Sequence, residues 1–94
     1  MPDDISLDTI VSRKPGILHS LLDDEVLALD VNSGIAFVFR LTARQIWDFL
    51  DKPISVQDLC GRMCDLFQVE QQQCRDEVLL FLRRLKADDV IQLG

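Results

Sequence analysis

The sequence predicts an α+β domain in which a three-stranded antiparallel sheet is followed by three helices. Of its 94 residues, 48% are hydrophobic and 28% are charged, which is typical of one folded globular domain. Before residue 41 the apolar segments are short, rich in β-branched residues and separated by turns. After residue 41 the apolar residues recur with the period of a helix. Strands are therefore expected first and helices second.

The three strands are expected where short apolar segments lie between polar turns. The turn Asn32-Ser33-Gly34 is a strong hairpin signal, because Asn and Gly tolerate the positive φ that tight turns require. Pro15-Gly16 marks the start of the first strand. Residues 15–94 are therefore interpreted as one domain and residues 1–14 as an N-terminal arm of uncertain order. The predicted strands are Ile17–Leu22, Val26–Asp30 and Ile35–Phe39.

The three helices each have a start or a stop signal. Thr42 and Gln45 fit a capping box at the start of the first helix, and Pro53 follows its end. The second helix is expected to open at Ser55, and the third to run from about Gln73 to Ala87. The side chains expected to face the core are Ala43, Ile46, Trp47 and Leu50, then Val56, Leu59, Cys60, Met63 and Phe67, then Cys74, Val78, Phe81, Leu82 and Leu85.

The order of these elements predicts a winged helix-turn-helix fold. The second and third helices have the spacing of a helix-turn-helix, and the preceding hairpin would form the wing. The last apolar segment, Val90–Leu93, is interpreted as a final strand or an extended tail.

The charge and hydropathy patterns exclude several classes of partner. Acidic residues outnumber basic ones 16 to 10, and the net charge of −6 argues against nucleic acid or an anionic membrane as the main partner. The longest apolar runs, Ile35–Phe39 and Val78–Leu82, are too short to span a bilayer. The N-terminal residues 1–4 have no signal-peptide character. We therefore expect a cytoplasmic protein.

No catalytic or metal-binding motif is evident in the sequence. There is no glycine-rich phosphate loop and no HExxH motif, and the acidic runs fall at turns and helix ends. The three cysteines Cys60, Cys64 and Cys74 and the single His19 could supply four zinc ligands. However, Cys60 and Cys64 lie one turn apart on a core-facing stripe, where thiols commonly pack as small apolar groups. We predict no enzyme activity, no cofactor and no metal.

A DNA-binding regulator is an alternative function for this fold. Gln71–Gln73 and Arg75 would lie at the start of the third helix, where base contacts are usually made. The same helix carries Asp76 and Glu77, and the whole domain is acidic. The electrostatics therefore argue against DNA.

The third predicted strand is apolar on both faces. Ile35, Phe37 and Phe39 point one way, and Ala36 and Val38 point the other. If this strand is the outer one, its unpaired backbone could template an incoming peptide strand. It could instead pair with a second copy of the chain, giving a homodimer. Alternatively, the helices cover one face and the C-terminal segment covers the other.

A flank of the third helix could form the second wall of a groove beside this strand. At 100° per residue, the flank lies about a third of a turn from the direction of the core. The alternative is an ordinary, partly buried helix shoulder. The flank consists of Arg75, Leu79 and Lys86, with Leu82 on its border.

The order of these features resembles the PqqD family over about residues 16–93. The chain departs from the family where many relatives have Leu-Asn and this sequence has Leu41-Thr42, although Thr is also a competent N-cap. The residues that carry the resemblance are Leu41–Trp47 (LTARQIW), Ile54–Leu59 (ISVQDL), Phe67, Asp76-Glu77-Val78, Phe81, Leu82, Leu85 and Val90-Ile91.

The resemblance implies a non-catalytic domain that binds the leader segment of a ribosomally synthesised precursor peptide. In this family the leader adds as a strand to the third strand of the sheet and rests against the third helix. A partner enzyme would then act on the peptide: a radical enzyme in pyrroloquinoline quinone synthesis, or a cysteine protease followed by a cyclase in lasso-peptide systems. The Ile46-Trp47 pair and the Asp51–Val56 stretch favour the lasso type, with the quinone type as the alternative. Carried over by position, the leader would pair with Ile35, Ala36, Phe37, Val38 and Phe39 and lie against Arg75, Leu79, Leu82 and Lys86.

Overall fold

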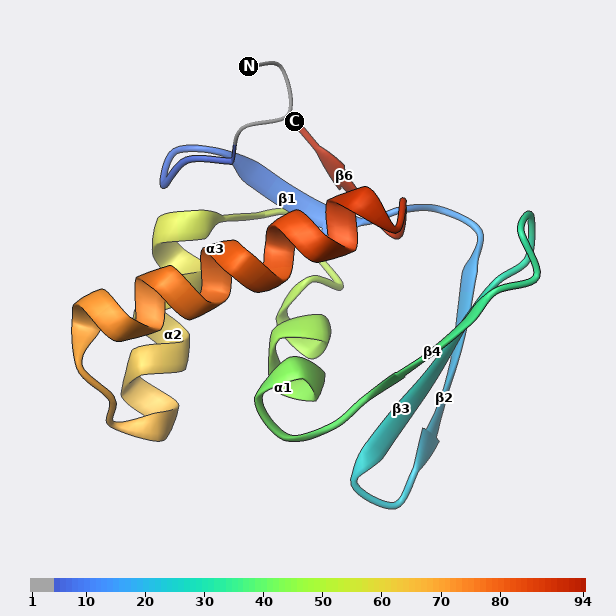
Figure 1. Cartoon of the computed structure of the whole chain (residues 1–94), viewed down its shortest axis with the longest axis horizontal. Helices are drawn as coiled ribbons and strands as arrows, with labels where there is room; N and C mark the ends of the chain where they lie inside the picture. The colour runs from blue at the N-terminus through green and yellow to red at the C-terminus, as the bar shows by residue number, and fades with distance from the viewer. Residues whose placement is uncertain (1–4) are drawn as a thin grey trace.

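The sheet predicted from the first half of the chain is confirmed in the computed structural model, which describes residues 5–94 (Figure 1). It is an antiparallel meander with the strand order β2 (Ile17–Leu22), β3 (Glu25–Asp30), β4 (Ala36–Phe39). The register pairs Leu18 with Leu29 and Leu29 with Ala36. Because β3 is the central strand, β2 and β4 are the two edges.

A second antiparallel sheet, which the sequence did not predict, joins distant parts of the chain. β1 (Ile10–Arg13) lies between β5 (Ile54–Ser55) and β6 (Ile91–Leu93). The expected N-terminal arm therefore contains a central strand, whose Val11 is fully buried, and the C-terminal segment is a strand and not a tail. The alternation of apolar and polar side chains over the four residues of β1 is too short to predict a strand. Its partner strands lie far along the chain, so no nearby turn indicates the pairing. Residues 1–4 of the expected arm lie outside the described residues.

The helices follow the predicted order with differences at their starts. The predicted capping box is wrong, because Thr42 lies inside α1 and the N-cap residue Arg40 makes no side-chain cap bond. Leu41 has a φ of +53° where the chain turns from β4 into α1. The start of α2 is as predicted, since the Ser55 hydroxyl accepts a hydrogen bond from the Asp58 N–H at 3.1 Å. The helices are α1 (Leu41–Phe49), α2 (Val56–Phe67) and α3 (Gln71–Ala87). None of the helices in this part of the chain is long and apolar enough to cross a membrane.

The core contains side chains from all three helices and from both sheets. Trp47 of α1 is fully buried, and its ring stacks on Phe39 of β4 with the centroids 4.9 Å apart. Arg13 of β1 donates to the Trp47 carbonyl from Nε at 3.0 Å and from Nη2 at 2.7 Å, and its guanidinium lies 4.9 Å from the indole centroid. One residue of α1 thus holds the meander and the second sheet together.

Candidate functional site

β4 is an edge strand with free backbone groups. Among the described residues it pairs with β3 on one side and with no strand on the other. The hydrogen-bonding groups of an antiparallel strand alternate between its two sides. The Asp30 N–H donates to the Ile35 carbonyl at 3.0 Å, so residues 35, 37 and 39 bond towards β3. The N–H and C=O groups of Ala36 and Val38 therefore point to the open edge.

A hollow of about 420 Å³ runs between β4 and the C-terminal half of α3. Its β4 wall includes Phe37, which is half-buried, and Phe39, which is buried. The open edge of β4 and the hollow thus lie side by side. The hollow is lined by Ala36, Phe37, Val38, Phe39, Ala43, Phe81, Arg84, Leu85 and Asp88.

Three aromatic rings that line this hollow lie close to one another. Phe37 and Phe39 lie parallel, with an interplanar angle of 2° and centroids 6.3 Å apart. Phe81 of α3 meets Phe39 edge-on at 6.1 Å and 90°. These contacts join β4 to α3.

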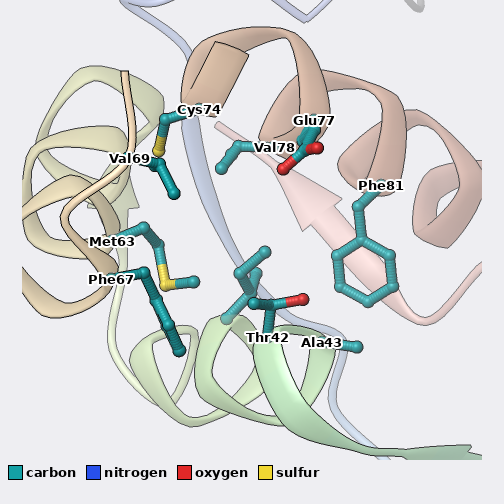
Figure 2. Close-up of a pocket in the computed structure, with 10 residues that line it drawn as sticks. Thr42, Ala43, Met63, Phe67, Val69, Cys74, Glu77, Val78 and Phe81 are labelled. Atoms are coloured by element: carbon teal, nitrogen blue, oxygen red, sulfur yellow. The ribbon is translucent and has the colours of Figure 1, made fainter. Parts of the chain in front are cut away.

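A second, smaller cavity of about 140 Å³ adjoins this hollow (Figure 2). The two share Ala43 and Phe81, so they are neighbours along α1 and α3. Figure 2 shows Met63 and Phe67 on the side opposite Phe81, with Glu77 at the α3 wall. Sequence periodicity assigned most of these residues to the core, so it did not predict a cavity among them. The lining consists of Thr42, Ala43, Ile46, Met63, Phe67, Val69, Cys74, Glu77, Val78 and Phe81.

The cysteine in the wall of this cavity is a packing group. Burial, with further contributions from Cys64 and Glu77, raises the pKa of the Cys74 thiol, so it stays protonated at neutral pH. Its Sγ donates to the Cys60 carbonyl at 3.6 Å. In residues 5–94, no group of three or more His, Cys, Asp or Glu side chains could hold a metal ion.

The structure places the predicted β4 residues together at the open edge. Phe37 and Phe39 face the hollow, and Ala36 and Val38 carry the free backbone groups. Ile35 lies just before β4, and its side chain is 55% exposed. Their role in binding remains a prediction.

The predicted α3 residues are not among those that line the hollow beside β4, and their role in binding stays a prediction. Leu82 is fully buried in the core, and Arg75 lines a polar hollow next to α2. Leu79 and Lys86 lie on the same flank of α3 as Arg75. The opposite flank of α3 faces β4. The sequence could not predict this, because it indicates the direction of the core but not the side of the core on which the strand lies. The α3 residues that face β4 are Phe81, Arg84, Leu85 and Asp88.

Comparison with known proteins assigns the chain to a family. Residues 25–91, from β3 into β6, match the family model described as coenzyme PQQ synthesis protein D (PqqD). The chain therefore belongs to the PqqD family, as its sequence pattern predicted. A search of the curated proteins finds no match.

Among solved structures, the chain is similar to TbiB1 in complex with the TbiA(beta) leader peptide. The two share 20% sequence identity with a TM-score of 0.81. The match covers 86% of this chain and 94% of TbiB1. At this identity the likeness shows a shared fold.

Proposed function

We propose that this protein binds the leader segment of a ribosomally synthesised precursor peptide and presents it to a separate enzyme. The observation that carries the proposal is the open edge of β4 beside the hollow formed with α3. Membership of the PqqD family and the likeness to a protein that holds a leader peptide support it. The domain itself would be non-catalytic, and the chemistry would belong to the partner enzyme.

In this proposal the leader adds to the meander as a fourth strand. Its backbone pairs with the free groups of Ala36 and Val38. Alternate side chains of the leader then point into the hollow, against Phe37 and Phe81. Arg84 would supply a cation at the rim of the hollow. Main-chain pairing would provide affinity, and the hollow would select apolar side chains.

The topology and the pathway are part of the same proposal. We interpret α2 and α3 with the adjoining meander as a winged helix-turn-helix. The Ile46-Trp47 pair and the Asp51–Val56 stretch favour a lasso-peptide system, in which a protease would remove the bound leader, over a quinone system.

Contacts at the start of α3 argue against the alternative of DNA binding. The Gln72 amide donates to Asp76 at 3.0 Å, and the Gln73 amide donates to Glu77 at 3.4 Å. Two of the four side chains that would read bases are thus engaged by carboxylates on their own helix, and these carboxylates would also repel phosphates.

A ¹⁵N–¹H correlation titration tests the proposal. The probe is a candidate leader peptide from a short reading frame next to this gene, with a scrambled peptide of the same composition as the control. We expect shifts confined to residues 35–39 and to the α3 residues that face β4. Shifts on the Arg75 flank instead, or none at all, would reject this site. Shifts with a DNA duplex at low salt would favour the regulator.

A further inference from the structure

The other edge of the meander, β2, is also open. Among the described residues it pairs with β3 alone, and five of its six residues are exposed. Leu18, Leu21 and Leu22 expose 62%, 59% and 54% of their surface. Figure 1 shows β2 on the side of the meander that is remote from α1. A long apolar edge strand of this kind is a site for pairing with another strand.

β2 lacks the features that normally protect an edge strand. Its sequence ILHSLL contains no proline and no Asp, Glu, Lys or Arg. Its register with β3 is continuous from Ile17 to Leu22, without a bulge. The chain carries a net charge of −6, yet this strand holds no formal charge with His19 neutral. Two copies could therefore meet through β2 without opposing like charges.

The free backbone groups of β2 belong to its odd-numbered residues. The Val31 N–H donates to the Gly16 carbonyl at 3.3 Å, which places the even-numbered residues on the β3 side. By alternation, the N–H and C=O groups of Ile17, His19 and Leu21 point to the open edge. A partner strand must present its own free groups to these positions.

We propose that two copies of this chain pair antiparallel through β2, with Ser20 on the two-fold axis. This register pairs the free groups of His19 with those of Leu21 of the second copy. On the face of the sheet that carries Leu18 and Leu22, each Leu18 lies opposite Leu22 of the other copy, which gives two leucine pairs. A register centred on His19 would oppose two histidines and set Leu18 against Ser20. The two leucine pairs therefore favour the Ser20 register.

The pairing merges two meanders into one six-stranded sheet with a β4 edge at each end. It leaves the hollow beside β4 open, and it does not rest on the proposed function. Contact through one pair of strands is smaller than the roughly 1,600 Å² of a standard protein interface. We therefore expect an equilibrium that depends on protein concentration.

A cysteine cross-link tests both the edge and the register. Ser20 is exposed, and opposite residues in a non-hydrogen-bonded antiparallel pair have Cα atoms about 4.5 Å apart, within disulfide range. The variant Ser20→Cys should form a covalent dimer with oxidised glutathione, at least fivefold faster than wild-type protein. The matched control is His19→Cys, whose thiol would face Leu21 and lie too far from its own copy. Faster cross-linking of His19→Cys, or no excess for Ser20→Cys, would overturn the proposal.

Sedimentation velocity on the unmodified chain supplies a second readout. The dimer fraction of wild-type protein should rise with concentration. In Ser20→Lys, two cations would face each other across the axis, and the dimer dissociation constant should rise roughly tenfold or more. A wild-type protein that stays monomeric at millimolar concentration, or a dimer unaffected by Ser20→Lys, would contradict the pairing.

Discussion

Replacing Val38 with proline should weaken leader binding while leaving the domain folded. The Val38 N–H points to the open edge of β4, so the substitution removes no hydrogen bond to β3. Proline is tolerated at such edge positions, and the preceding residue already has the extended backbone that proline requires. The Val38 side chain is 54% exposed, so little packing is lost. We expect a loss of stability of about 1 kcal/mol or less.

The cost in binding should be larger than the cost in folding. The leader loses one main-chain hydrogen bond, and its carbonyl is left without a partner beside the proline ring. Together these effects amount to about 2 kcal/mol, or a roughly 30-fold weaker Kd. The matched control is Val38→Ala, which removes the same side chain and keeps the N–H. Its Kd should change by no more than about threefold.

Isothermal titration calorimetry with the leader peptide measures both affinities, and thermal denaturation followed by circular dichroism checks that each variant is folded. The variant Phe37→Pro is a control for a proline that does disturb folding. The Phe37 N–H lies on the β3 side, so its loss should unfold the meander. A folded Val38→Pro protein that binds as tightly as Val38→Ala would refute main-chain pairing at β4.

Three further predictions address the α3 wall, the core and the acid dependence of stability. Phe81→Ala should weaken leader binding roughly tenfold, whereas Arg75→Ala on the other flank should leave the Kd unchanged; calorimetry that shows the reverse would place the leader beside α2. Arg13→Ala removes two hydrogen bonds to a main-chain carbonyl of α1 and should lower the free energy of unfolding by about 2 kcal/mol in urea titrations. The hydrogen bond from Lys14 lowers the pKa of Asp89 below its usual 3.8. The Lys14–Asp89 pair therefore stabilises the folded state at pH values above 3.8, and this contribution is lost as the pH falls through the lowered pKa of Asp89. Asp89→Asn should flatten this acid dependence, and an unchanged slope of stability against pH would show that the pair does not contribute.

The local elements of this fold follow from neighbouring residues. The meander strands were predicted within about a residue, because apolar runs and the Asn32-Ser33-Gly34 turn act over a few residues. The start of α2 was predicted because the Ser55 cap bonds three residues away. The PqqD assignment depends on the same spaced apolar positions and could therefore be made from sequence.

The second sheet and one wall of the candidate site depend on tertiary structure alone. β1 pairs with β5 and β6, and such pairings between distant segments leave no local pattern. The periodicity of α3 indicates the stripe that is buried, but both flanks of that stripe look alike in sequence. Only the packing of α3 across β4 decides that Phe81 and Arg84 face the open edge and that Arg75 does not. Local patterns thus determined the meander strands and the three helices, whereas the direction in which α3 crosses β4 determined the residues that could meet a peptide.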